Sequence, residues 1–467
     1  MLPRRLPLGL RQGVASRSVD EGIFRAAVLV GSFSILIKIA ATARELLVAN
    51  NFGRSDQVDA FLIAFVLPQT IINLVSSAFS ASLIPVFSAV RAERGQIAAE
   101  SLLTRTLVAS EGILVAFSLL AATCTPCIIR VLGSGFSPTK RDLTCRLFYW
   151  LLPTVAFNGM TVILGAVLNV HRRFLATSCT PMVTPLLTLM LVGTCARIWG
   201  VWTLVIGTFA GSCVESLIML NYFLAHGLKL RWKQCGLNGE LRLVLRQYLP
   251  LLGGGILTGG LGLVDQAVTA DMPAGSVGAY AYGTRIVGVI LAVVSGSMST
   301  ALTPYFAEMV THGDWSGCRT TIRTYSRLMI AISLPLTMGM ICFSYPLVRG
   351  LYQHGAFTAT DTSVVSGVQI ANSISIPFVS VGIIYVRFLS TVRRNEILMA
   401  SAAVNLVLDV VFDVVFGKIF GVAGVALATS GFYVVSCAML VCYGHRELRR
   451  LSAISLPILP CETSACD

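Results

Sequence analysis

The stretch RELLVANNFGRSDQVDAF, residues 44–61, lies between two strongly apolar segments of the chain. AAVLVGSFSILIKIAATA (26–43) precedes it and LIAFVLPQTIINLVSSAF (62–79) follows it. The stretch itself carries charged side chains on both sides of an expected turn, namely Arg44, Glu45 and Asp59. Because each flanking segment is long and apolar enough to cross a bilayer, we predict two membrane-spanning helices with charges close to their junction.

The same apolar pattern recurs along all 467 residues. Hydrophobic residues make up 55% of the chain and charged residues only 12%, whereas about a quarter of the residues of a soluble globular protein are charged. The sequence therefore predicts an all-α polytopic membrane protein with about twelve spanning helices. The predicted spans are 23–48, 57–81, 102–124, 145–168, 175–196, 200–224, 247–270, 277–303, 325–345, 362–390, 396–416 and 419–443.

Positive charge gives these spans an orientation. A net charge of +13 would suggest a nucleic-acid partner in a soluble protein, but most of the 35 Lys and Arg residues fall on one side of the predicted membrane. Such an excess marks the cytoplasmic side, so we expect both termini to be cytoplasmic and no nucleic-acid partner. The predicted domains are a cytoplasmic N-terminal segment (1–22), a six-helix lobe (23–225), a basic cytoplasmic linker (226–246), a second six-helix lobe (247–445) and a cytoplasmic tail (446–467).

The two predicted lobes contain an internal repeat. Four matches occur in the same order at an offset of 219 to 221 residues: Asp59 with Gly278, Pro85 with Pro304, Pro126 with Pro346, and Arg172 with Arg393. A repeat of six helices, an even number, gives both copies the same orientation in the bilayer. The repeat therefore predicts two pseudo-symmetric lobes around a central cavity, with alternating access by rocking of one lobe against the other.

Charged residues inside the predicted spans are the main functional signal. A charge at a helix centre costs about 2.5–3.5 kcal/mol on insertion scales, so such residues are usually paired or functional. We expect five of them to converge on the cavity: Lys38, Arg44, Glu45, Asp59 and Arg285. The alternative is that the three charges of the opening stretch cap an interfacial turn and pair with one another, and that Arg285 pairs with an acidic neighbour.

A second polar group lies in the C-terminal half. Asn405, Asp409 and Asp413 are spaced by four residues on one predicted helix, which places them along one face, and Asp265 lies on another helix. Carboxylate and amide oxygens suit a hard cation, and desolvated carboxylates suit a proton relay equally well. The alternative for Asp413 is that it reaches the outer membrane interface.

No catalytic or nucleotide-binding motif accompanies these charges. The sequence has no GxxxxGK[ST] loop, and its five histidines are isolated from one another. We therefore expect a transporter rather than an enzyme, with no cofactor apart from Na⁺ or H⁺ as a coupling ion.

Several motifs together resemble those of a known family. They are KIAATARELLVANNFG (38–53), VDAFLIAFVLP (58–68), AFSASLIPVFS (78–88), GAVLNVHRRF (165–174), LTPYFAE (302–308) and LYQHGAFTATD (351–361). In this order they resemble the MurJ (MviN) family of bacterial lipid II flippases, a branch of the MOP exporter superfamily. Members of this family move undecaprenyl-pyrophosphate-linked peptidoglycan precursor outward across the cytoplasmic membrane through a cationic cavity between two six-helix lobes.

The resemblance implies roles for particular residues. It implies substrate binding by Lys38, Arg44, Asp59 and Arg285, with Glu45 in support, and a cation site at Asp265, Asn405, Asp409 and Thr429. Arginine and lysine suit a pyrophosphate group. The resemblance also implies a multi-pass location in the bacterial inner membrane, a lipid-linked glycan as substrate, and membrane lipids and the cell-wall synthesis machinery as partners.

The chain departs from the family pattern in two places. Ile72 and Asn73 stand at or near the positions of an Arg-Arg pair on the second helix, which makes another lipid-linked glycan an alternative cargo. Many members also carry two further C-terminal helices, whereas we expect no span after 443, so the lipid tail would lie against lobe-facing lipid.

Lipid II remains the predicted cargo. The rival functions are a flippase for an O-antigen or exopolysaccharide precursor, a cation-coupled multidrug antiporter, a membrane glycosyltransferase and a membrane scaffold. An antiporter would need acidic rather than basic cavity residues, and a glycosyltransferase would need catalytic carboxylates near a large outer loop.

Overall fold

The computed structural model describes residues 31–171, 173–230, 248, 255–256 and 259–454. Within these ranges the chain is helical apart from turns and short connections, and no strand occurs there. Ten helical stretches of the described chain are long and apolar enough to cross a membrane. The predicted spans 23–48 and 247–270 extend beyond the described residues, but their described parts, 31–48, 248, 255–256 and 259–270, are helical. The predicted all-α polytopic fold is confirmed.

The chain divides into two compact units. The first consists of Met1–Phe52, Ala60–Val131 and Ser137–Gly255, and the second of Gly53–Asp59, Leu132–Phe136 and Ile256–Asp467. Two short segments, 53–59 and 132–136, thus pack with the second unit although their sequence neighbours belong to the first. The predicted domain boundaries stay a prediction, because most of the linker 226–246 lies outside the described residues.

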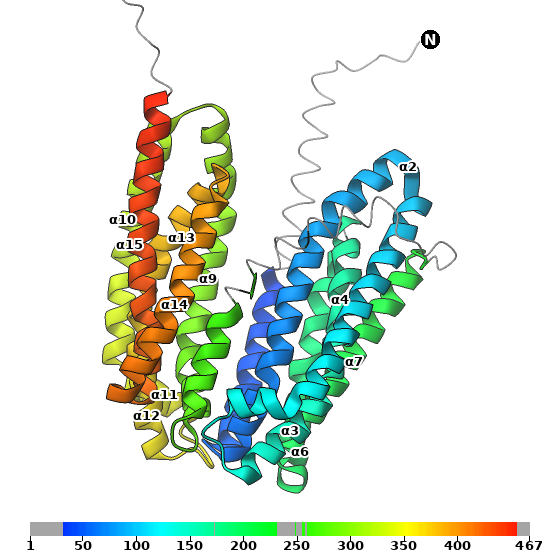
Figure 1. Cartoon of the computed structure of the whole chain (residues 1–467), viewed down its shortest axis with the longest axis vertical. Helices are drawn as coiled ribbons and strands as arrows, with labels where there is room; N and C mark the ends of the chain where they lie inside the picture. The colour runs from blue at the N-terminus through cyan, green and yellow to red at the C-terminus, as the bar shows by residue number, and fades with distance from the viewer. Residues whose placement is uncertain (1–30, 172, 231–247, 249–254, 257–258, 455–467) are drawn as a thin grey trace, which may run out of the picture. The chain divides into compact units, whose positions relative to one another are not determined.

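The first unit begins with helical residues 31–52, followed by the long helix α2 (Asp56–Leu132) (Figure 1). Residues 82–101, which lie between the predicted spans 57–81 and 102–124, are helical as well. This segment, SLIPVFSAVRAERGQIAAES, is rich in strong helix formers. The chain turns only at Gly95, whose φ of 83° is the left-handed conformation that glycine adopts at little steric cost.

The remaining helices of the first unit are α3 (Pro138–Leu151), α4 (Pro153–Val170), α5 (Phe174–Cys179), the 3₁₀ turn η1 (Thr180–Met182), α6 (Val183–Trp199) and α7 (Trp202–Ala225). The predicted span 145–168 is interrupted because Pro153 starts a new helix at its first position. Helices α6 and α7 pack closely at Gly207, where an added Cβ would lie 2.8 Å from the Thr188 Cα.

The second unit contains α9 (Ser276–Thr311), α10 (Trp315–Cys342), α11 (Ser344–Tyr352), α12 (Ala359–Ser373), α13 (Ser375–Thr391), α14 (Asn395–Phe420) and α15 (Val422–Ile454) (Figure 1). The predicted span 362–390 is divided between α12 and α13 at Ile374. Thr358 and Asp361 form a capping box that starts α12. Phe306 of α9 and Phe388 of α13 lie edge to face in the core, with ring centroids 5.8 Å apart.

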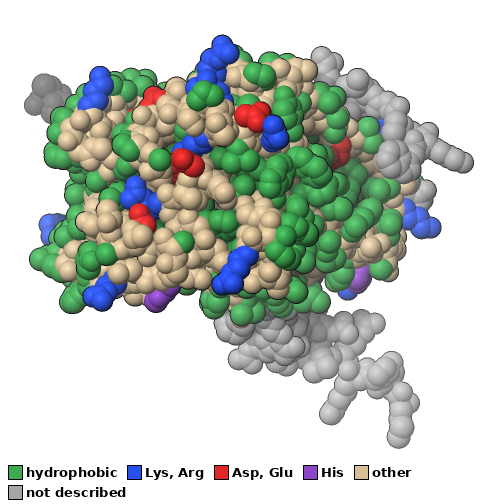
Figure 2. Space-filling view, turned by 90° about the horizontal axis from the view of Figure 1, so that it is seen from below, with side chains coloured by type: hydrophobic (Ala, Val, Ile, Leu, Met, Phe, Trp, Pro, Cys, Tyr) green, Lys and Arg blue, Asp and Glu red, His purple; other side chains and the backbone are tan. Residues whose placement is uncertain are grey.

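Hydrophobic side chains also cover much of the face shown in Figure 2, with Lys and Arg scattered between them. On α6, for example, Met190 is 65% exposed and Ile198 is 79% exposed. Side chains of this kind on a long helix are stable against lipid tails, which agrees with the spanning length of the helices.

Candidate functional site

The predicted basic residues of the first unit lie on helical residues 31–52. Lys38 is exposed, and Arg44 and Glu45 are each partly buried. The Arg44 Nη2 atom lies 3.4 Å from the Glu45 Oε1 atom, so these neighbours form a loose ion pair. Such a contact between partly exposed groups contributes about 0–1 kcal/mol, and it leaves most of the guanidinium donors of Arg44 available to an anionic group.

Asp59 lies in the second unit and is only 1% exposed. Its two carboxylate oxygens accept hydrogen bonds from the backbone N–H of Gly275 at 2.7 Å and of Gly278 at 2.8 Å. These groups belong to the first turn of α9, whose N-cap residue Gly275 has no side chain with which to cap the helix. Asp59 therefore supplies the negative charge and the acceptors that a helix N-terminus requires.

Arg54 holds the same segment in place. Its Nε donates to the Gly275 carbonyl oxygen at 3.0 Å, and its Nη1 lies 3.3 Å from Asp361 Oδ1. The adjacent Gly53 has a φ of +53°, and an added Cβ would lie 2.6 Å from the Ala356 carbonyl oxygen. The residues 53–59 are thus fixed to α9 and to the start of α12. The structure shows Asp59 as a buried cap of α9, and its predicted part in substrate binding stays a prediction.

Arg285 lies on α9, and its side chain is exposed. Lys38 and Arg44 belong to the first unit and Arg285 to the second. Substrate binding by these three residues therefore stays a prediction.

The acidic residues of the C-terminal half do come together. Asp265, from helical residues 259–270, and Asp409 and Asp413, from α14, each offer an oxygen within 4.8 Å of the others, and all three are buried. We call these three residues the acidic cluster. The two helices pack in ordinary van der Waals contact at Gly417, where an added Cβ would lie 3.7 Å from Val268 Cγ1.

Polar side chains from neighbouring helices surround the acidic cluster. The Tyr280 hydroxyl donates to Asp265 and lies 3.3 Å from the Thr429 hydroxyl. Asn405 uses its amide N–H to donate to Ser436, which leaves its Oδ1 without a hydrogen-bond partner among the described residues. The structure therefore associates Asp265, Asp409 and Thr429 in one place, with Asn405 nearby on α14.

Most oxygens of the acidic cluster have no donor. Both oxygens of Asp409, both of Asp413 and one of Asp265 accept no hydrogen bond from a described residue. Buried carboxylates without donors are unfavourable unless protons or a cation neutralise them. The donor set, hard anionic and neutral oxygens, fits an alkali or alkaline-earth cation.

Sequence reasoning missed one member of this site, Tyr280, and left two alternatives open for Asp413. Asp413 is fully buried within the acidic cluster, which favours its grouping with Asp409 over the alternative that it reaches the outer membrane interface. Its spacing of four residues from Asp409 was the available signal. Tyr280 lies on a different helix, and no pattern in the sequence links it to the acidic residues. Only the fold brings its hydroxyl to Asp265.

Long apolar helices in two compact units, with a buried cluster of cation-compatible oxygens in one of them, define a multi-span membrane transporter. A family model described as "Lipid II flippase MurJ" matches residues 48–458. The chain therefore belongs to the MurJ family.

Relatives and solved structures agree with this family. A probable lipid II flippase MurJ of Synechocystis is 23% identical, with 94% of this chain and 84% of the relative covered. Another, from Vibrio cholerae, is 23% identical, with 91% and 83% covered. A solved structure described as lipid II flippase MurJ in an inward closed conformation has a TM-score of 0.79 at 21% identity and covers 91% of this chain and 90% of its own. A solved structure of an inward-facing multidrug resistance MATE transporter of the MOP superfamily has a TM-score of 0.76 at 14% identity. The match covers 92% of this chain and 99% of the transporter.

Proposed function

We propose that the chain translocates lipid II, the undecaprenyl-pyrophosphate-linked peptidoglycan precursor, across a bacterial cytoplasmic membrane by alternating access. The observation that carries the proposal is the family match over residues 48–458. Long helices with apolar surfaces support the membrane location. The excess of Lys and Arg in one set of loops supports cytoplasmic termini.

Lys38, Arg44 and Arg285 are the residues we assign to the pyrophosphate. A guanidinium group can donate two parallel hydrogen bonds to phosphate oxygens, and a lysine ammonium adds a point charge. Arg44 is suited to this role because its ion pair with Glu45, at 3.4 Å, involves one nitrogen and leaves its other guanidinium N–H groups for an anion. Asp59 contributes indirectly. Its own oxygens are occupied by backbone amides, so it supports the position of Arg285 by capping α9, the helix that carries Arg285.

The acidic cluster, with Asn405 and Thr429, would hold a coupling cation. A cation bound there would neutralise carboxylates that lack donors. The chain's own contribution is to collect oxygens from helical residues 259–270, α14 and α15, and to orient Asp265 through the Tyr280 hydroxyl. Since the cation would favour the arrangement in which these helices meet, it could bias the transporter toward one of its states.

A second cargo, another lipid-linked glycan such as an O-antigen or exopolysaccharide precursor, is favoured by one observation. Ile72 is buried and Asn73 is exposed on α2, where the resemblance implies an Arg-Arg pair. A cavity with fewer positive charges would bind a pyrophosphate less strongly.

Complementation separates the two cargoes. The chain and its Arg44→Ala and Arg285→Ala variants are expressed in bacteria depleted of their own lipid II flippase, with the amount of each variant in the membrane measured. Arg146→Ala serves as the matched control, because Arg146 is exposed and pairs only at the surface with Asp142. We expect rescue by the wild type and the control and its loss in the two variants. Absence of rescue by well-inserted wild type would favour the second cargo.

A further inference from the structure

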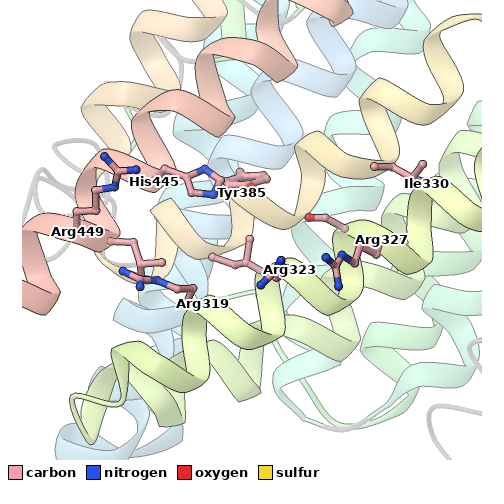
Figure 3. Close-up of a pocket in the computed structure, with 11 residues that line it drawn as sticks. Arg319, Arg323, Arg327, Ile330, Tyr385, His445 and Arg449 are labelled. Atoms are coloured by element: carbon pink, nitrogen blue, oxygen red, sulfur yellow. The ribbon is translucent and has the colours of Figure 1, made fainter.

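A basic pocket of about 440 Å³ lies within the second unit, apart from every residue assigned above. Its lining comes from α10, α13 and α15, and Figure 3 shows Arg319, Arg323 and Arg327 along α10, with His445 and Arg449 on α15. The three arginines of α10 are spaced by four residues, which places them on neighbouring turns of one helix face. The pocket therefore gathers four guanidinium groups on two helices.

These arginines have no acidic counterpart. No Asp or Glu lines the pocket, and none of its four arginines forms an ion pair with a residue that the structure describes. The acid on the neighbouring turn of α15, Glu447, is already paired with Arg394 at 2.9 Å. Four exposed arginines in one pocket repel one another unless an anion is bound between them.

Tyr385 and Gly444 bring α13 and α15 close together at the pocket. Tyr385 of α13 is 4% exposed, and its ring lies 5.7 Å from the ring of His445. Gly444 permits this arrangement, because an added Cβ would lie 2.5 Å from the Tyr385 Cδ1 atom. This close packing places His445 and Arg449 of α15 beside Tyr385 of α13.

The pocket continues into an apolar surface on the same helix. Ile330 lines it, and Ile330 and Leu334 are 42% and 48% exposed. A soluble anion would gain nothing from these side chains, whereas the acyl chains of a lipid would lie against them. Positive charge at one end of a spanning helix, followed by exposed apolar residues, matches the arrangement of a lipid's phosphate and tails.

We propose that this pocket binds the phosphate group of an anionic membrane phospholipid, at a site separate from the transport substrate. The guanidinium groups of α10 and Arg449 hold the phosphate oxygens, and the exposed apolar residues of α10 contact the acyl chains. Because the pocket is built from α10, α13 and α15, an occupied pocket links these three helices and favours their packed arrangement.

The test uses the full chain in nanodiscs of phosphatidylcholine, titrated with a fluorescent phosphatidylglycerol. The variant is the double substitution Arg319→Gln and Arg323→Gln. Each arginine near an anionic lipid contributes roughly a fivefold change in affinity, so the pair should weaken binding about 25-fold. Arg446→Gln is the matched control, because Arg446 is exposed on the same end of α15 but does not line the pocket.

Two further arms make the result decisive. The charge-retaining double variant Arg319→Lys and Arg323→Lys should keep most of the affinity for phosphatidylglycerol. If the glutamine variant lost affinity only because it misfolds, the lysine variant would give no such contrast. Inorganic phosphate at millimolar concentration should compete only weakly with phosphatidylglycerol. Equal binding by the wild type and the glutamine variant would overturn the proposal. Complete displacement by inorganic phosphate would also overturn it, since it would identify a site for a soluble anion.

Discussion

Asp59 and the acidic cluster are both buried carboxylate sites of the second unit, but their surroundings differ. Asp59 has a backbone N–H for each oxygen. Asp409 and Asp413 have no donor among the described residues for any of their four oxygens. A satisfied buried carboxylate stabilises one structure, whereas an unsatisfied one requires a proton or a cation. The comparison therefore separates a structural acid from acids that are suited to a coupling function.

The largest effect is expected for Asp59→Ala. The substitution leaves the N–H groups of Gly275 and Gly278 without acceptors in a buried place, at a cost of about 1–3 kcal/mol for each unsatisfied group. We therefore expect a clear fall in the melting temperature of the purified protein in detergent, with Lys38→Ala, an exposed position, as the control. A variant that melts with the wild type would show that Asp59 does not support α9.

The opposite behaviour is expected for Asp409→Asn. Without added cation, the variant should be as stable as the wild type or more stable, because one of three crowded carboxylates has lost its charge. The wild type should gain up to about 2.7 kcal/mol when NaCl replaces choline chloride at 100 times the dissociation constant, and the variant should lose this gain. Melting in the two salts measures the difference.

Asp142→Asn is the matched control for that experiment. Asp142 is 62% exposed and pairs with Arg146 at the surface, so its variant should keep the sodium-dependent gain. If the wild type shows no difference between the two salts, the acidic cluster does not bind sodium. Asp413→Asn extends the comparison: loss of the gain would make Asp413 a member of the cation site.

The smallest effect is expected for Asp314→Ala, because Asp314 caps α10 as Asp59 caps α9 but is fully exposed. Two hydrogen bonds to Asp314 lower the pKa of its carboxyl group. The larger effect comes from the Gly317 N–H and the smaller one from the Ser316 hydroxyl. A lowered folded-state pKa stabilises the protein above the unfolded-state value of about 3.9, and this contribution disappears as the pH falls through the folded-state pKa.

The Asp314→Ala variant should accordingly melt slightly below the wild type at pH 7, and the difference should shrink at pH 3. Asp314→Asn preserves an N-cap acceptor and should lie close to the wild type at pH 7. A constant difference at both pH values would contradict a contribution from the ionised carboxylate.

Much of the fold could be predicted because bilayer thickness requires long apolar segments, and these are visible along the chain. Breaks within the helices were harder to place. Residues 82–101 are more polar and were left outside the predicted spans, yet they are helical, because a helix can continue beyond the membrane. Pro153 divides a predicted span because proline lacks the N–H that a helix interior requires, an effect that hydropathy does not register.

The candidate site was predicted unevenly for a similar reason. Asn405, Asp409 and Asp413 share a helix face through local spacing alone, so their association could be recognised. Asp265 was grouped with them, but its partner Tyr280 was not found, since no local pattern links separate helices. The four guanidinium groups of the basic pocket were likewise distributed between two distant segments of the sequence.

The sequence by itself determined the membrane-spanning helices, the repeat, the family and the polar face of α14, because these depend on composition and on residue spacing along one helix. Only the tertiary structure decided that Asp59 caps α9, that Asp265 meets Asp409 and Asp413, and that Arg319 and Arg449 border one pocket. Each of these contacts joins residues far apart in the chain. Their distances are set by helix packing, which local periodicity does not encode.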